Sequence, residues 1–244
     1  MKGVLGLPDG VSACLFDLDG VLTDTARLHA AAWEEMFDEF LRRHGAAPFD
    51  PHADYDEYVD GRPRLDGVRS FLKSRAITLP EGSPDDPPGT ESVASLARRK
   101  NDLVLEAIRK EGVKAYPGSV EYVKAARDAS LHRAVVSASA NCRDVLRAAG
   151  IEELFEQIID GHVAQREQLA GKPAPDTYLA AARALSVEPG AAAVFEDALA
   201  GVQAGRAGAF ALVVGVDRVG QAEQLKAHGA DVVVSDLAQL LDAG

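Results

Sequence analysis

Residues 11–25 read VSACLFDLDGVLTDT, and this stretch decides the fold. The apolar run from Val11 to Phe16 predicts a buried strand, and Gly20 lets the chain turn away directly after it. Side chains at i and i+2 of an extended chain point to the same side, so we expect Asp17 and Asp19 to address one reacting group. A carboxylate attacks phosphorus well when a cation, here Mg²⁺, offsets the charge repulsion. Aspartates at strand ends are also common turn formers, so the motif needs support from the rest of the chain.

The composition limits the classes of protein to which this chain can belong. The chain has 244 residues, of which 47% are hydrophobic, enough for one domain with a sizeable insertion. Its net charge of −12 argues against nucleic acid or an anionic membrane as a partner. Cys14 and Cys142 have neither metal-ligand nor disulfide spacing, and the chain has no signal-peptide run and no apolar stretch of membrane-spanning length. We therefore expect a soluble, cytoplasmic monomer.

The segment after the first strand has a helical pattern. Thr25 is a good N-cap for a helix that runs to about His44 and ends at Gly45. Further helices are expected at 55–59, 68–72 and 92–105, and no strand pattern occurs among them. Residues 80–89, PEGSPDDPPG, predict a loop from proline and glycine content alone. The sequence thus predicts a helical insertion directly after the first strand.

From about Glu111 onward, strands alternate with helices. Strands are expected at 132–136, 158–160, 193–196, 210–214 and 231–234, helices at 119–129, 142–149 and 176–185, and a loop from 161 to 171. Six apolar runs end in polar residues, at Asp17, Ser137, Asp160, Glu196, Asp217 and Ser235. This pattern predicts an open, doubly wound parallel α/β sheet that binds its ligand at the carboxyl edge. We see no chemistry in the last two strands.

Two of these strand ends, and the loop that follows the Asp160 strand, carry groups suited to phosphoryl transfer. Ser137-Ala138-Ser139-Ala140-Asn141 places hydroxyls before a helix N-terminus, which favours a phosphate cradle, although Ser and Asn can also serve as caps. Lys172, stiffened by neighbouring prolines, can neutralise Asp17 and the transferring oxygens. Glu196 and Asp197 suit a hard divalent cation, although Asp197 could instead cap the next helix.

The helical insertion contributes two basic groups. Gly61-Arg62-Pro63-Arg64 places two guanidinium groups on a constrained loop, suited to a phosphate. Residues 98–101, RRKN, are the second group, and a solvated helix face explains such a run about as well. His29 lies one helical turn before Trp33 near the helix start and is expected to point toward the Asp17 loop.

Asp17 to Thr25, DLDGVLTDT, resembles the nucleophile motif of the haloacid dehalogenase (HAD) superfamily of phosphotransferases. The continuation ARLH followed by Ala32-Trp33 resembles its narrower β-phosphoglucomutase branch. SASxN, GKPAPD and EDxxxG follow in the family's order. The resemblance implies a Rossmann-like HAD core, residues 1–27 and 108–244, and an inserted α-helical cap, residues 28–107, that closes over the site and excludes water.

The resemblance also implies a role for each matched residue. Asp17 is the implied nucleophile and Asp19 the general acid and base. The implied catalytic set is Asp17, Asp19, Lys172, Ser137 and Thr25. The implied substrate-binding set is His29, Trp33, Gly61, Arg64, Lys100, Ala138, Ser139 and Asn141. The implied Mg²⁺ set is Asp17, Asp19 through its carbonyl, Glu196 and Asp197.

In the reaction that the resemblance implies, β-D-glucose 1-phosphate becomes glucose 6-phosphate through an aspartyl-phosphate and glucose 1,6-bisphosphate. Two positions depart from the branch, because Asp60 and Ala140 stand where it has lysine; Arg62 or Arg143 would have to compensate. The 80–89 loop lengthens the cap and leaves room for a larger substrate. A Mg²⁺-dependent sugar-phosphate phosphatase is the alternative, and a catalytically silent binding protein is the third hypothesis.

Overall fold

The computed structural model describes residues 4–83, 85–87 and 89–243. Two compact units divide the chain: the first joins the residues up to Asp24 to those from Val113 onward, and the second comprises Thr25–Gly112. The cap boundaries proposed from the sequence, 28 and 107, lie inside those of the second unit. No helix within the described ranges is both long and apolar enough to cross a membrane.

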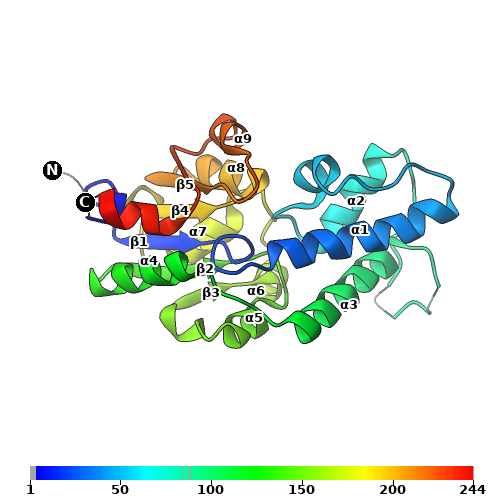
Figure 1. Ribbon diagram of the computed structural model, residues 1–244, viewed down its shortest axis with the longest axis horizontal. Helices are drawn as coiled ribbons and strands as arrows, with labels where there is room; N and C mark the ends of the chain where they lie inside the picture. Colours follow the sequence, from blue (N-terminus) through cyan, green and yellow to red (C-terminus); the bar gives the residue numbers. More distant parts are fainter. Residues whose placement is uncertain (1–3, 84, 88, 244) are drawn as a thin grey trace. The chain divides into compact units, whose positions relative to one another are not determined.

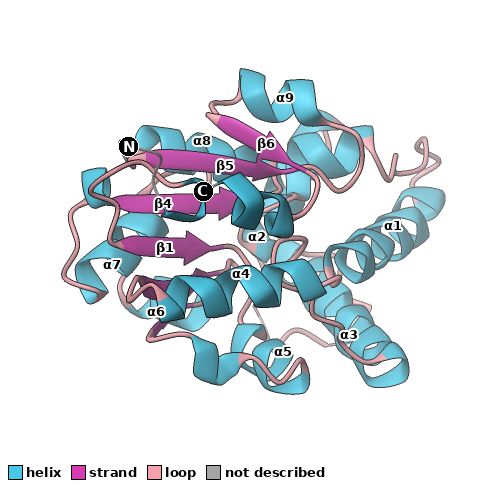
Figure 2. Cartoon of the chain, turned by 60° about the vertical axis from the view of Figure 1, so that its left-hand side comes forward, coloured by secondary structure: helices cyan, strands magenta, loops and turns pink. Residues whose placement is uncertain are grey.

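A six-stranded parallel sheet forms the centre of the first unit, in the order β3-β2-β1-β4-β5-β6. The strands are β1 (Ala13–Phe16), β2 (His132–Val136), β3 (Gln157–Ile159), β4 (Ala192–Glu196), β5 (Leu212–Val216) and β6 (Val232–Val234). Figure 2 shows β1, β4, β5 and β6 side by side, with their arrows pointing the same way. Phe16 pairs with Phe195 in the register, which places Asp17 level with Glu196 at the carboxyl edge. The predicted sheet is confirmed.

Helices cover this sheet (Figure 1): α4 (Pro117–Asp128), α5 (Cys142–Ala148), α6 (Gly161–Arg166), α7 (Asp176–Ala184), α8 (Leu199–Ala207) and α9 (Ala222–Ala227). Short 3₁₀ turns occur at η1 (Val4–Gly6), η3 (Glu152–Leu154), η4 (Pro189–Ala191) and η5 (Leu237–Ala243). Strands β1, β4 and β5 are buried along their whole length, as expected for a parallel sheet covered on both faces.

Three sequence-based boundaries are wrong. The 161–171 loop contains α6, because the Asp160 carboxylate caps it by accepting a hydrogen bond from Val163 N at 2.9 Å. Strand β5 starts at Leu212 rather than at Phe210, whose ring instead packs edge-on against Tyr178 of α7. Strand β1 starts at Ala13, two residues after the predicted start.

The second unit contains helices joined by loops, and no strand occurs among its described residues. It contains α1 (Ala26–Arg43), the π-helical turn η2 (Tyr55–Val59), α2 (Arg64–Ser74) and α3 (Val93–Glu111). Helices α1 and α3 run side by side (Figure 1), and aromatic side chains fill the space between the helices, including Trp33, Phe37 and Phe71. Thr25 is the N-cap residue of α1, as the sequence predicts, but it has helical backbone angles and its side chain makes no capping hydrogen bond.

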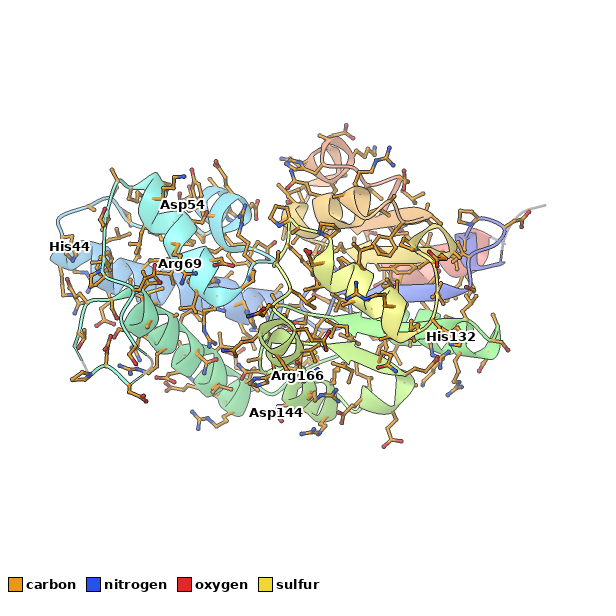
Figure 3. The ribbon with its side chains drawn as sticks, turned by 180° about the vertical axis from the view of Figure 1, so that it is seen from behind. His44, Asp54, Arg69, His132, Asp144 and Arg166 are labelled. Atoms are coloured by element: carbon orange, nitrogen blue, oxygen red, sulfur yellow. The ribbon has the colours of Figure 1, made fainter. Side chains whose placement is uncertain are left out.

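The 80–89 segment is attached to this unit by charged contacts. Arg69 on α2, labelled in Figure 3, donates to the Glu81 carboxylate at 2.7 Å. Ser92 caps α3 by accepting from Ser95 N and donates to Asp86 at 2.9 Å. No helix or strand occurs among the described residues of the segment, as the sequence predicts; Pro84 and Pro88 lie outside the described residues.

Candidate active site

Two neighbouring strand ends bring three carboxylates together in the first unit. Asp17 follows β1, Glu196 ends β4 and Asp197 comes next. Each offers an oxygen that lies within 4.8 Å of the oxygens of the other two. All three residues are buried, with exposed fractions of 6%, 0% and 8%. Three buried negative charges at this separation require compensation by cations.

Two glycines make room for these carboxylates. A Cβ atom on Gly20 would lie 1.7 Å from Asp197 Oδ2, and Gly20 also has a φ of +92° that other residues adopt only with strain. A Cβ atom on Gly201 in α8 would lie 1.8 Å from Glu196 Oε1. The cluster therefore depends on glycine at both positions.

Lys172 supplies one compensating charge. Its Nζ donates to Asp17 Oδ1 at 2.6 Å and to Glu196 Oε1, although Lys172 and Asp17 are 155 residues apart. Burial favours the neutral amine, but Asp17 and Glu196 outweigh it and raise the pKa of Lys172 above its usual value. Lys172 is therefore a permanently charged ammonium group in contact with Asp17.

The negative charge of the cluster that Lys172 does not balance favours the binding of a divalent cation. Burial raises the pKa of Asp17 well above its usual value, Lys172 opposes this, and Glu196 and Asp19 add to it. A bound cation would reverse the shift and hold Asp17 as a carboxylate. Buried carboxylate oxygens are the ligands that Mg²⁺ prefers, and Gly20 clears the space beside Asp197, so the residues fit this ion.

Glu196 is occupied by protein partners. Its Oε1 accepts from Lys172 and from the Tyr178 hydroxyl at 2.8 Å, and its Oε2 accepts from Ala198 N at 3.1 Å. Burial is the main cause that raises the pKa of Tyr178, and the charge of Glu196 raises it further. The phenol therefore stays neutral and donates a hydrogen bond. These contacts make Glu196 a counter-charge for Lys172. Because both of its oxygens already accept hydrogen bonds, they compete with direct ligation of a metal.

Asp19 lies in a tight loop next to the cluster. Gly20 N donates to Thr23 O at 2.8 Å, and the Thr23 hydroxyl donates to Leu18 O at 3.2 Å. Asp19 is partly exposed, whereas Asp17 is buried. A fixed but accessible carboxyl group beside a buried one is suited to moving a proton to or from a bound molecule.

The loop after β2 folds around its own hydroxyls. Ser137 Oγ accepts from Ser139 N and Ser139 Oγ accepts from Asn141 N, both at 3.1 Å. Because each hydroxyl oxygen accepts from the backbone, its hydrogen is free to be directed toward an anion. Lys172 Nζ lies 3.5 Å from Val136 O, directly before Ser137. A Cβ atom on Gly161 would come within 2.9 Å of Ala138 O, so this loop packs tightly against the start of α6.

The second unit groups its predicted residues separately. Lys100 Nζ lies 2.9 Å from His29 Nδ1 and 4.8 Å from the centre of the Trp33 ring. Trp33 itself belongs to the hydrophobic core of this unit. Thr25 is fully buried, and its carbonyl accepts from Leu28 N at 2.9 Å. His29, Trp33 and Lys100 therefore form one group.

The basic loop of the second unit is held by its own contacts. Arg64 donates to Asn101 Oδ1, and burial lowers the pKa of Arg64. Gly61 has a φ of +67°, and this left-handed conformation shapes the turn that precedes Arg64. Arg62 donates to Glu57 O at 3.3 Å, and Arg143 of the first unit lies 3.6 Å from Asp160 and 3.5 Å from Glu152. Both arginines considered as substitutes for the missing lysines thus have protein partners.

Comparison with known proteins identifies the family. The model of the haloacid dehalogenase-like hydrolases matches residues 11–208. The chain belongs to this family. It is 57% identical to a β-phosphoglucomutase of Mycobacterium tuberculosis over 98% of this chain and 94% of that protein. It is 31% identical to a β-phosphoglucomutase of Bacillus subtilis over 94% of this chain and 92% of that one. The crystal structure of a Clostridium difficile β-phosphoglucomutase covers 94% of this chain and 93% of its own, with a TM-score of 0.75 and 27% identity.

One residue that contacts the carboxylate cluster was not predicted from the sequence. Tyr178 is fully buried, donates to Glu196, and lies with its ring centre 5.1 Å from Lys172 Nζ. The only signal in the sequence is its place in the first turn of the helix that follows the GKPAPD motif. An aromatic residue there indicates core packing, because the partner of its hydroxyl lies in a strand that comes later in the chain.

Proposed function

We propose that this protein is a β-phosphoglucomutase that converts β-D-glucose 1-phosphate to glucose 6-phosphate. The 57% identity to the mycobacterial β-phosphoglucomutase over nearly the full length of both chains carries the proposal. The carboxylate cluster with its buried lysine supports it, because phosphoryl transfer needs a nucleophile and cations at one point. The 31% identity to the Bacillus enzyme gives further support.

In this proposal Asp17 carries the phosphoryl group. An oxygen of Asp17 attacks phosphorus, the bond from phosphorus to the sugar oxygen breaks, and an aspartyl-phosphate forms. The 6-hydroxyl of β-D-glucose 1-phosphate then attacks this phosphorus and yields glucose 1,6-bisphosphate. The bisphosphate turns over and returns its 1-phosphoryl group to Asp17, and glucose 6-phosphate leaves. Glucose 1,6-bisphosphate is thus both the intermediate and the phosphoryl donor that starts the cycle.

The other residues of the first unit assist this exchange. Asp19 takes the proton from the attacking hydroxyl and returns one to the leaving sugar oxygen. Lys172 offsets the charge of Asp17 and of the transferring oxygens, and Ser137 donates a hydrogen bond to them. Asp17, Asp197 and the Asp19 carbonyl would hold Mg²⁺, with Glu196 behind them. When bound, Mg²⁺ supplies positive charge that lets an anionic nucleophile approach an anionic phosphate.

We assign sugar-phosphate recognition to the second unit and to the loop after β2. His29 and Lys100 offer hydrogen-bond donors to sugar hydroxyls or phosphate. The Lys100 ammonium group lies over the Trp33 ring. By the resemblance, Arg64 of the second unit and Ser139 and Asn141 of the first are assigned to the phosphate that is not being transferred, and Gly61 and Ala138 to the same substrate-binding set. Thr25 follows the Asp17 loop and completes the catalytic set.

Two residues favour a phosphatase as the second candidate. Asp60 and Ala140 each replace a lysine of the branch, which removes positive charge near the residues assigned to the second phosphate. A weaker hold on the bisphosphate would release it and leave the aspartyl-phosphate to water. The product of that route is free phosphate.

One assay separates the two candidates. The protein is incubated with β-glucose 1-phosphate, Mg²⁺ and catalytic glucose 1,6-bisphosphate, while glucose 6-phosphate and free phosphate are measured together. We expect glucose 6-phosphate without free phosphate, and a loss on the order of 10⁴-fold in Asp17→Asn. Free phosphate as the main product would overturn the mutase in favour of the phosphatase. Activity that survives in Asp17→Asn would overturn the assignment of the nucleophile.

A further inference from the structure

The loop after β5, Asp217–Gln221, contacts both loops that carry the acidic residues. It lies at the carboxyl end of β5, and sequence reasoning assigned no chemistry to this part of the sheet. One of its side chains reaches the loop of Asp19, and another reaches the backbone of Asp197. We refer to residues Asp217–Gln221 as the brace loop.

Gln221 is the contact to Asp197. Its Nε2 donates to Asp197 O at 3.0 Å, and the residue is only 8% exposed. Its Oε1 is buried and has no hydrogen-bond partner among the described residues. A buried acceptor without a donor is costly unless water or a ligand supplies one. A hydrated Mg²⁺ ion held by Asp197 would bring such donors, because this ion keeps several of its waters.

Arg218 is the contact to the loop of Asp19. Its Nε donates to Gly20 O at 2.8 Å, and another guanidinium nitrogen lies 3.5 Å from Val21 O. The guanidinium carbon lies 3.7 Å from the centre of the Tyr116 ring, and a third contact reaches Ser235 O at 2.7 Å. A planar group fixed by stacking and by several carbonyls has little freedom, so the Gly20 carbonyl is held in place.

Asp217 fixes the shape of the brace loop itself. Its Oδ1 accepts from the backbone N–H groups of Val219, Gly220 and Gln221 at 3.2, 2.7 and 2.9 Å. Burial opposes ionisation, but these N–H groups outweigh it and lower the pKa of Asp217. The carboxylate therefore stays charged and holds the backbone from which Arg218 and Gln221 extend.

We propose that Arg218 and Gln221 are positioning residues that set the two acidic loops of the active site. Gln221 orients Asp197 for the cation and offers Oε1 to its hydration shell. Arg218 holds the Gly20 carbonyl and thereby fixes Asp19 for proton transfer. The part concerning Arg218 rests on the proposed phosphoryl transfer, whereas the part concerning Gln221 rests only on cation binding.

Calorimetric titration of the sugar-free protein with Mg²⁺ tests Gln221. Gln221→Met keeps the length of the side chain and removes the amide, and Gln224→Met on the exposed face of α9 is the matched control. We expect Mg²⁺ to bind about 10-fold more weakly to Gln221→Met, as for the loss of a residue that orients a metal ligand. Gln221→Ala repeats the test if the methionine variant does not fold. Binding within twofold of the wild type, or equal weakening in Gln224→Met, would overturn the role of Gln221.

Turnover tests Arg218. Arg218→Met is compared with Arg206→Met, which removes an exposed surface arginine. We expect kcat to fall about 10-fold with KM nearly unchanged in Arg218→Met, and partial rescue in Arg218→Lys, which retains the positive charge and one donor nitrogen. Tyr116→Leu, which removes the stacking ring, is the second variant if Arg218→Met does not fold. A lower melting temperature with wild-type kcat would contradict a positioning role.

The two readouts separate this proposal from the proposed function. A wild-type protein that releases only free phosphate would end the mutase proposal, and kcat would then be taken from phosphate release. A wild-type protein that binds Mg²⁺ but forms neither product would end both candidate functions. In that case the titration of Gln221→Met still decides the role of Gln221.

Discussion

The carboxylate cluster of the first unit and the His29–Lys100 pair of the second are built in different ways. The cluster is fixed by strand ends and by residues far apart in the chain, with Lys172 between Asp17 and Glu196. The pair joins the side chains of two adjacent helices and is supported by the Trp33 ring. We infer that the cluster carries the chemical step, where small displacements are costly. Changes to the pair should instead alter substrate binding.

After removal of the nucleophile itself, the largest effect should come from filling the space beside Asp197. In Gly20→Ala the new methyl group collides with Asp197 Oδ2, whereas Gly10→Ala has a similar φ of +90° and nothing within 4 Å. We expect Gly20→Ala to lose about 100-fold in Mg²⁺ affinity and in kcat. Gly10→Ala should lose only about 1 kcal/mol of unfolding free energy, from backbone strain. Calorimetry measures the Mg²⁺ affinity, steady-state kinetics measures kcat, and thermal unfolding measures the unfolding free energy. Similar losses of Mg²⁺ affinity and kcat in the two variants would show that backbone strain alone explains the effect of Gly20→Ala.

A change in the second unit should act on binding. Lys100→Met removes the ammonium group that contacts His29, and Lys110→Met removes an exposed lysine from the same helix. We expect KM for the sugar phosphate to rise about 10-fold in Lys100→Met with kcat changed much less, because a binding contact is lost. Lys110→Met should match the wild type. Steady-state kinetics would contradict the comparison if kcat fell and KM did not change.

Two buried tyrosines distinguish stability from function. Tyr178 donates to Glu196, and Tyr122 donates to Leu5 O at 3.0 Å; both rings are fully buried. Each change to phenylalanine should cost about 1 kcal/mol of unfolding free energy, since one hydrogen bond is lost. Only Tyr178→Phe should also lower kcat, by a few-fold, because Glu196 loses one of the contacts that hold it against Lys172. Equal kcat values in the two variants would remove Tyr178 from the site.

The smallest effect should come from restoring a missing charge. Ala140→Lys returns the cation that the β-phosphoglucomutase branch has between Ser139 and Asn141. We expect a few-fold tighter hold on glucose 1,6-bisphosphate, because one exposed charge pair contributes about 1 kcal/mol or less. The measurement is the concentration of bisphosphate that gives half-maximal turnover. An unchanged value would show that the loss of this lysine does not weaken the site.

The sequence predicted the parallel sheet and the polar strand ends because both follow from local patterns. Apolar runs that end in Asp17, Ser137 and Glu196 needed no knowledge of distant contacts. Helix α6 was missed because it has only one or two turns and depends on the Asp160 cap. Tyr178, Arg218 and Gln221 were missed because each acts through a partner that lies 18 to 198 residues away.

The measurement closest to the central claim locates the phosphoryl group. The protein is mixed with Mg²⁺ and glucose 1,6-bisphosphate, quenched, and reduced with borohydride, which converts a phosphorylated aspartate to homoserine; peptide mass spectrometry then finds the site. We predict homoserine at position 17 only, and none in Asp17→Asn. Modification at another aspartate, or a phosphate retained on Ser137 or His29 instead, would contradict the account.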